Sequence, residues 1–410
     1  MQYPLKKPYS NLHAKNLRTE LRRLLDTPLE FHRKAILASH GSLDEVLAGD
    51  RPVVIYPAAR MASSAAALLQ ARGVDVRGFS DKNQALWGRT LNGLPVVPPS
   101  EIAVLAASGA VLVASSLHDS DIREYLVSSG CTNSYSMPYL NYCLPEVFSS
   151  REYFKAIEAP FRPNARGLIF KLFDLLADDI SRHVLVSKIR YYLTLDKGLL
   201  DGVWSSQPTY FDPEIIVPVT DEIVVDGGAF NGDTLQQFLR ITDGQFQRYY
   251  AFEPDPGVFE NLRRLASFDS GRIECVRAGL SDRTGTLNFS VTGSVDSAVV
   301  TADGQPTESL PVVDLDSYFG NCEPPSMIKM DIEGSERAAL EGARGLINEC
   351  EPSLAVSTYH FPRDLWEIPL LIVRLNPGSR LYLRHYTREI DDTVCYAVPG
   401  NRVLSATHTS

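Results

Sequence analysis

Acidic side chains follow two short apolar segments in the second half of the chain. Residues 223–225 are a β-branched apolar run typical of a buried strand, and Asp226 comes directly after it. Three glycines within residues 227–232 predict a tight turn, after which helical spacing begins. A second apolar segment, residues 249–252, is followed by Glu253. Strand, glycine turn, helix and second strand form the start of a nucleotide-binding βαβ unit.

The chemistry of this unit depends on its two carboxylates. Glycines let the backbone approach a ligand closely, and an acid at the end of the second strand can accept hydrogen bonds from both ribose hydroxyls. A carboxylate at Asp226 repels a pyrophosphate and attracts a cation. S-Adenosylmethionine fits, since it carries a ribose, an ammonium and a sulfonium but no phosphate. The alternative is a ligand-free turn whose glycines serve packing alone.

Further carboxylates, Asp331 and Glu333, come at the end of a predicted strand over residues 327–331. Alternate residues of an extended strand share a face, so both side chains are predicted to point beyond the carboxyl edge of the sheet. Methyl transfer from such a donor requires an acceptor atom aligned opposite the sulfonium and, where that atom carries a proton, a route for the proton. Asp331 is the first candidate for either task. Alternatively, Asp331 and Glu333 supply two oxygen ligands to Mg²⁺, with no third ligand assignable.

A histidine is predicted at the same edge of the sheet. His360 ends a strand over residues 353–360, and an imidazole that titrates near neutrality suits proton removal. Its alternative is a structural role. Glu336 is interpreted mainly as a carboxylate in the first turn of a helix behind a Ser335 cap. His385, near the end of a closing strand, is a weaker candidate base.

Three motifs together carry a family resemblance. Residues 226–229 (Asp-Gly-Gly-Ala), 251–254 (Ala-Phe-Glu-Pro) and 329–336 (Lys-Met-Asp-Ile-Glu-Gly-Ser-Glu) resemble the FkbM-type methyltransferases over about residues 210–399. The commoner family form lacks the doubled glycine of residues 227–228. The resemblance implies a class I methyltransferase fold, α/β with a Rossmann-like, doubly wound seven-stranded sheet. It also implies methyl transfer from S-adenosylmethionine to an oxygen of a sugar or polyketide-like acceptor.

The resemblance extends to the residues that would bind the donor. The third strand is predicted at residues 273–276. In adenosylmethionine enzymes the segment after this strand commonly contacts the adenine, which points to Ser281 or Asp282. The alternative is that Ser281 and Asp282 only form a turn. The expected cofactor-binding residues are Asp226, Gly227, Gly228, Asn231, Glu253, Pro254, Asp255, Ser281, Asp282 and Asp331. The expected catalytic residues are Asp331, His360 and Glu333.

The first half of the chain predicts a smaller parallel sheet. Strand-like segments at residues 52–56, 74–79, 96–97 and 110–114 alternate with helical ones, and the layout resembles Rossmann-like N-terminal domains beside sugar-modifying enzymes. Pro57-Ala58-Ala59 stands where the glycines would be, and its Cβ atoms crowd a pyrophosphate. We therefore expect a degenerate domain used for assembly or acceptor positioning. A working dinucleotide site, with Asp81 on a ribose, is the alternative.

These segments predict four parts of the chain. They are an N-terminal helical extension (1–50), the degenerate Rossmann-like domain (51–150), a helical linker or cap (151–210) and the methyltransferase domain (211–410). Residues 292–306 read as a loop beside the acceptor site. Two other functions stay open: a nicotinamide-dependent oxidoreductase and a non-catalytic nucleotide-binding scaffold.

Composition limits the partners. A net charge of −10 argues against nucleic acid, and no basic run suits an anionic membrane. No signal peptide and no membrane span are expected. Six cysteines without CxxC spacing predict buried, reduced thiols of a cytoplasmic protein. The expected partner is a small-molecule or glycan acceptor, and a homo-oligomer is compatible with the sequence.

Overall fold

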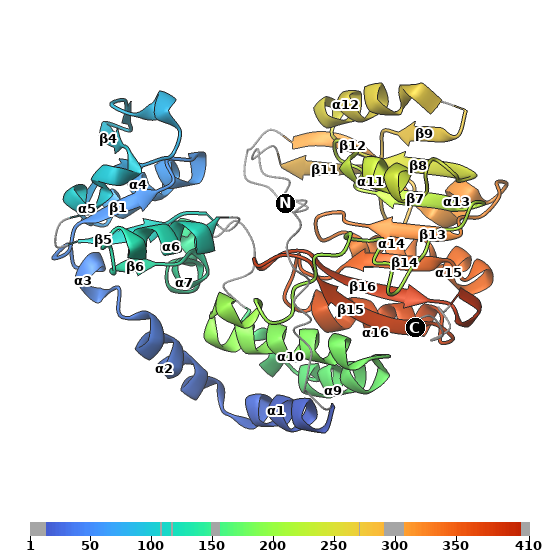
Figure 1. Ribbon diagram of the computed structural model, residues 1–410, viewed down its shortest axis with the longest axis horizontal. Helices are drawn as coiled ribbons and strands as arrows, with labels where there is room; N and C mark the ends of the chain where they lie inside the picture. The colour runs from blue at the N-terminus through green and yellow to red at the C-terminus, as the bar shows by residue number, and fades with distance from the viewer. Residues whose placement is uncertain are drawn as a thin grey trace.

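Two large β-sheets, each flanked by helices, form the main body of the molecule, and further helices join them (Figure 1). The computed structural model describes residues 14–106, 109–115, 118–148, 156–269, 271–290 and 307–402. The loop expected at residues 292–306 lies outside this described part, as do the first residues of the chain.

The larger sheet has the seven strands that the sequence predicted. Its order is β15-β16-β14-β13-β7-β8-β9, and every neighbouring pair is parallel except those made by β16. The three central strands, β13, β14 and β7, are buried along their whole length, as expected of apolar runs covered on both faces. The strand bounds are β7 (Ile223–Gly227), β8 (Arg248–Phe252), β9 (Ile273–Val276), β13 (Met327–Met330), β14 (Ser353–Ser357), β15 (Arg380–His385) and β16 (Thr393–Val398).

Helices cover both faces of this sheet. Adjacent residues of β7 point to opposite faces, so Val224 packs with α11 and α12 while Val225 packs with α13 to α16. Phe238 of α11 lies at the centre of the first face, in contact with the rings of Phe211 and Tyr249. The helix bounds are α11 (Asp233–Ile241), α12 (Pro256–Ala266), α13 (Leu315–Phe319), α14 (Glu336–Glu341), α15 (Arg344–Cys350) and α16 (Asp364–Leu375).

A small sheet that the sequence did not predict as such extends the C-terminal half. Its order is β10-β12-β11, with β10 at Gly279–Leu280, β11 at Gly285–Ser290 and β12 at Thr307–Val313. The sequence indicated β11 through its alternating apolar residues, but Pro311 inside β12 obscured that strand. The position of β10 matters for the site, because it follows β9 directly at the carboxyl edge of the large sheet.

The N-terminal sheet is parallel, as predicted, apart from one hairpin. Its order is β3-β4-β2-β1-β5-β6. The hairpin between β3 and β4 turns at Asn92-Gly93, both with positive φ, a dipeptide that signals such a turn in sequence. The bounds are β1 (Val53–Tyr56), β2 (Val76–Ser80), β3 (Thr90–Leu91), β4 (Leu94–Val97), β5 (Ala110–Val113), β6 (Ser134–Tyr135), α3 (Asp44–Leu47), α4 (Arg60–Ala71), α5 (Ile102–Leu105), α6 (Asp119–Ser128), α7 (Met137–Cys143) and α8 (Pro145–Phe148).

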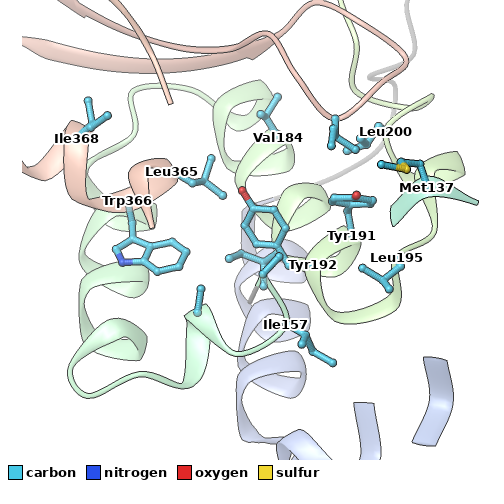
Figure 2. Packing of buried hydrophobic residues seen from close by; sticks show 14 of the residues in the cluster. Met137, Ile157, Val184, Tyr191, Tyr192, Leu195, Leu200, Leu365, Trp366 and Ile368 are labelled. Carbon is cyan, nitrogen blue, oxygen red and sulfur yellow. The ribbon is translucent and has the colours of Figure 1, made fainter. Parts of the chain in front are cut away.

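Helix α10 (Asp179–Thr194) joins the two halves. Its residues Tyr191 and Tyr192 lie in one hydrophobic cluster with Met137 of the N-terminal domain and Trp366 of α16, as Figure 2 shows. The other helices of this layer are α1 (Ala14–Asp26), α2 (Leu29–His40) and α9 (Ala165–Leu175). The predicted linker therefore contributes the core that unites both domains.

A buried ion-pair network also ties the parts together. The Lys197 ammonium, in the segment after α10, pairs with Glu389 from the loop between β15 and β16 and lies 3.7 Å from Asp119 at the start of α6. Both carboxylates follow carboxyl ends of strands, Asp119 after β5 and Glu389 after β15. The carboxyl edges of the two sheets thus approach each other through Lys197.

The structure also bears on the expectations of buried cysteine thiols and of no membrane-spanning helix. All six cysteines lie in the described part and are free, but only Cys395 is buried, whereas Cys322 and Cys350 are exposed. The expectation of buried thiols is wrong for those two. Among the described residues, none of the helices has the length and apolar character to cross a bilayer.

Candidate functional site

The negative charge of Asp226 is paired with the ammonium of Lys329 on the neighbouring strand β13. Asp226 is fully buried, its Oδ1 lies 2.8 Å from Lys329 Nζ, and its Oδ2 accepts a hydrogen bond from Tyr249 (2.7 Å). Burial opposes protonation of Lys329, but Asp226 outweighs it and raises the pKa of Lys329. The expected free charge that attracts a cationic donor is therefore absent at Asp226. The pair instead positions the turn.

Lys329 holds the glycine turn directly. Its Nζ donates to the carbonyl oxygens of Gly227 (3.0 Å) and Gly228 (2.7 Å). Gly228 has φ +72, and a Cβ there would lie 1.9 Å from the carbonyl oxygen of Asp331. The doubled glycine thus allows the turn after β7 to touch the turn after β13. Packing between turns, one of the two roles considered for these glycines, is present in the structure.

Glu253 joins the ends of β7 and β8. Its Oε2 accepts the amide N–H of Phe230 (2.9 Å), and its Oε1 accepts that of Asp255 (2.8 Å). The side chain is almost fully buried, and burial raises the pKa of Glu253. Each carboxylate oxygen retains a further lone pair, so the group can still accept ribose hydroxyls. Phe230, half-exposed and with φ +45, projects from the turn beside it.

The other expected donor-site residues lie on the loops of the same edge. Exposed Asn231 accepts from the amide of Asp233, and exposed Asp255 caps α12. Pro254 is half-buried between them and the next loop. Ser281 is buried directly after β10, whereas Asp282 is exposed and pairs with Arg283 at 3.3 Å. These positions outline one side of the edge.

Asp331 lies on the other side, directly after β13. Tyr210 donates to its Oδ2 (2.8 Å) and Tyr359 to its Oδ1 (3.0 Å). Burial favours the neutral acid, but Lys329, His360 and the two phenols outweigh it and hold the pKa of Asp331 below its usual value. About a quarter of the side chain (24%) is exposed, enough to meet a ligand. The group is a carboxylate at neutral pH and suits orientation of a hydroxyl.

The prediction that Asp331 and Glu333 share one face of an extended strand is wrong. Strand β13 ends at Met330, and Glu333 has φ +57 in a tight turn, so the two residues do not alternate along a strand. They are nevertheless brought together around one imidazole. His360 Nε2 lies 3.3 Å from Asp331 Oδ1 and 3.6 Å from Glu333 Oε2.

His360 is held as an imidazolium. Its Nδ1 lies 3.0 Å from Oε1 of fully buried Glu336, and only 2% of its own surface is exposed. Burial lowers the pKa of His360, but Glu336 and then Asp331 outweigh it and raise it to about 9. A protonated ring cannot accept a proton, so this ion-paired state does not fit the general-base role expected of His360.

Glu336 does more than stabilise a helix end. Its Oε1 accepts the amides of Ile332 (2.8 Å) and Gly334 (3.4 Å), and so shapes the turn that carries Asp331. Ser335 makes no side-chain cap, contrary to expectation. His385 is sealed from solvent, and burial lowers its pKa well below the usual value.

Three residues of the site were missed from sequence as partners of Asp331. Tyr210 and Tyr359 are its hydrogen-bond donors, and Asp392 approaches from the loop between β15 and β16. Burial and the charge of Asp331 raise the pKa of Asp392 to about 6. For Tyr359 a signal was present, since it adjoins His360 at the end of β14.

The corresponding edge of the N-terminal sheet is closed by its own backbone. Asp81, after β2, accepts the amide of Ala58 at Oδ2 (2.9 Å) and that of Asn83 at Oδ1 (2.7 Å). Asp81, the acid that would bind the ribose of a dinucleotide, thus connects the loop after β1 to the loop after β2.

Sheet order and site together define a class of protein. Six parallel strands, with an antiparallel β16 between β14 and β15, are the arrangement of class I methyltransferases; here one acid lies near the end of β7 and another directly after β8. Residues 226–393 match the model of the methyltransferase FkbM domain. The C-terminal domain is thus similar to methyltransferase FkbM domains over residues 226–393.

Solved structures extend the likeness beyond that domain. The crystal structure of a methyltransferase FkbM from Methylobacillus flagellatus KT is 22% identical, with a TM-score of 0.67 over 93% of this chain and 98% of that chain. The fold of the N-terminal half is therefore shared as well. Aeropyrum pernix fibrillarin with bound S-adenosyl-L-methionine is 12% identical over 45% of this chain and 70% of its own, with a TM-score of 0.28. No curated protein matches the chain.

Proposed function

We propose that this methyltransferase uses S-adenosylmethionine to methylate a hydroxyl of a sugar, glycan or related natural-product acceptor. The observation that carries the proposal is Glu253 at the carboxyl end of β8, beside the glycine turn of a methyltransferase FkbM domain. A carboxylate so placed can bind both ribose hydroxyls of the donor. The neutralised Asp226 supports the turn from beneath, so the donor's cationic groups meet the other carboxylates of the edge.

Asp331 is the residue proposed to orient the acceptor. Its carboxylate accepts a hydrogen bond from the acceptor hydroxyl and directs an oxygen lone pair at the donor methyl. The oxygen–carbon bond forms as the carbon–sulfur bond breaks, and S-adenosylhomocysteine leaves with the electron pair of that bond. The hydroxyl becomes far more acidic as the new bond forms, so even a weak base such as Asp331 can take its proton late in the step.

The class of acceptor follows from charge and family. A net charge of −10 disfavours a nucleic-acid acceptor, whose phosphates would be repelled. The partly exposed carboxylate of Asp331 can accept a hydrogen bond from a hydroxyl, as sugars provide. Methylation of oxygen, and not of nitrogen, is the reaction that the FkbM resemblance favours.

Titration of the full chain with S-adenosylhomocysteine in a calorimeter tests donor binding. Glu253→Gln should weaken this binding about 10- to 100-fold, as expected when charge-assisted hydrogen bonds are lost. Glu260→Gln, at an exposed position on α12, is the matched control and should bind normally. Absence of heat, with no thermal stabilisation by the ligand, would remove the proposal. A heat signal with NADH in its place would favour the oxidoreductase alternative.

Methyl transfer itself needs a separate assay. The protein is incubated with methyl-labelled donor and a panel of cell-envelope glycans and nucleotide sugars. Transfer that is lost in Asp331→Asn, while S-adenosylhomocysteine still binds, supports the assigned role. Full transfer by Asp331→Asn removes Asp331 from the mechanism. Donor binding without transfer to any hydroxyl acceptor leaves the scaffold alternative as the better description.

A further inference from the structure

One cluster at the carboxyl edge has the composition of a metal site. Asp331, Glu336 and His360 each offer a ligand atom, and these three atoms lie within 4.8 Å of one another. Ligands about 2.1 Å from a shared ion lie roughly 3–4 Å apart. The three side chains come from the turn after β13, the start of α14 and the end of β14, so the fold itself gathers them.

Unpartnered atoms of buried side chains point to a missing ligand. Within the described residues, Glu336 Oε2 and both ring nitrogens of His360 make no hydrogen bond. Glu336 is 0% exposed and His360 is 2% exposed, so neither side chain contacts bulk water. The ring nitrogens lie close to carboxylates, with Nδ1 3.0 Å from Glu336 Oε1 and Nε2 3.3 Å from Asp331 Oδ1. Buried polar atoms left this way are costly unless something else satisfies them.

The local charge balance supports a cation. Asp331, Glu333 and Glu336 surround a single imidazole. The edge therefore holds more negative charge than its own cations offset, and a divalent ion would correct the imbalance.

We infer that Asp331, Glu336 and His360 bind a divalent first-row transition-metal ion, a site that goes beyond the proposed methyl transfer. Two carboxylates and an imidazole suit Mn²⁺, Fe²⁺ or Zn²⁺, whereas Mg²⁺ prefers oxygen ligands alone. This trio replaces the pair of Asp331 and Glu333 considered from the sequence for Mg²⁺. Asp331 is the ligand with exposed surface, so the ion would lie at the side of the edge assigned to the acceptor.

The test measures the metal directly, independently of activity. The full chain is purified, stripped with chelator, and titrated with MnCl₂ and with ZnCl₂ by calorimetry, with MgCl₂ for comparison. We expect one ion per chain for Mn²⁺ or Zn²⁺ and weaker binding of Mg²⁺. Glu336→Gln and His360→Gln should each weaken this binding by about 100-fold or more. Glu341→Gln, on the same helix α14 but paired with Arg344 and Arg374, is the control and should bind as wild type does.

A readout of folding protects the test against misfolded variants. S-Adenosylhomocysteine binding by Glu336→Gln shows that the variant is folded, and its thermal midpoint should no longer rise on addition of Mn²⁺ or Zn²⁺. If the stripped wild type binds neither ion at millimolar concentration, the inference is wrong and His360 is a permanent ion-pair partner. Equal binding by wild type and Glu336→Gln would also overturn it, since the ion would then lie elsewhere. Donor binding is scored separately, so failure of the metal site leaves the proposed function untouched.

Discussion

Replacing Gly228 by alanine should separate the two turns on which the site depends. The added Cβ would lie 1.9 Å from the carbonyl oxygen of Asp331, a backbone atom that cannot rotate away. Gly228 also has φ +72, a conformation that alanine adopts at a cost. Gly244 provides a matched control, because it has φ +69 and nothing lies within 4 Å of its Cβ position. It lies before β8, at the amino edge and so remote from the site.

The two substitutions share one energetic term and differ in another. The left-handed conformation costs an L-residue about 1–2 kcal/mol at either position. At Gly228 alone, the turns must also move apart, and overpacking of this kind adds about 1–3 kcal/mol. We therefore expect Gly228→Ala to lower the free energy of unfolding by roughly 2–5 kcal/mol and Gly244→Ala by about 1–2 kcal/mol.

Urea denaturation followed by circular dichroism measures the difference, and calorimetry with S-adenosylhomocysteine measures its consequence. Displacing the turn moves the amides that Glu253 holds, so Gly228→Ala should also weaken ligand binding more than tenfold, a loss of about 1.4 kcal/mol or more. Gly244→Ala should leave that affinity unchanged. Equal stability of the two variants within ~0.5 kcal/mol, together with equal affinity, would refute the reasoning that the turns are in contact.

Three further changes test the charges of the site. Lys329→Met should lower the free energy of unfolding by about 3–5 kcal/mol, because it leaves Asp226 buried and unpaired; the double variant with Asp226→Asn should lose less, and an additive loss would contradict the pairing. In chelator-treated protein, the stability advantage of wild type over His360→Gln should be fully present below pH 6.5, at about 3 kcal/mol, and vanish as the pH rises through 9. The advantage is lost at high pH because the pKa of His360 is higher in the folded than in the unfolded state. A difference in urea midpoint that stays constant across this pH range would argue that His360 is not an imidazolium. Tyr210→Phe removes a donor to Asp331 and should cost about 1.5–3 kcal/mol in the same denaturation assay, and a loss below ~0.5 kcal/mol would show that the bond contributes little.

The positions of the strands of the large sheet along the chain could be predicted because they depend on local pattern. Apolar β-branched runs such as residues 223–225 are recognised without knowledge of the rest of the chain, and parallel strands place their carboxyl ends at one edge. That was enough to bring Asp226, Glu253 and Asp331 to the same edge. Strands β3 and β6 have two residues each, too few to show a period.

The charge pairing and protonation of these side chains could not be predicted, because they depend on partners that are distant in the sequence. The neutralisation of Asp226 comes from Lys329, whose only sequence signal was a charge inside an apolar strand. Likewise, His360 has its pKa raised to about 9 by Glu336 and Asp331, which lie on other elements. Sequence reasoning assigned His360 its usual titration near neutrality, which the fold removes.

A row of polar contacts crosses the sheet edge from the donor side to the acceptor side, made in turn by Tyr249, Asp226, Lys329, Tyr210, Asp331, His360 and Glu336. At its centre Lys329 holds the turn after β7 through two carbonyls and lies 5.1 Å from the ring centroid of Tyr210, which in turn donates to Asp331. In the proposed reaction, a donor that tightens the turn after β7 would also restrain the Asp331 carboxylate, because Lys329 contacts the turn directly and Asp331 through Tyr210. Under the proposed function, this connection gives a buried lysine in an apolar strand a role, because its charge would link the turn proposed to bind the donor to the carboxylate proposed to meet the acceptor.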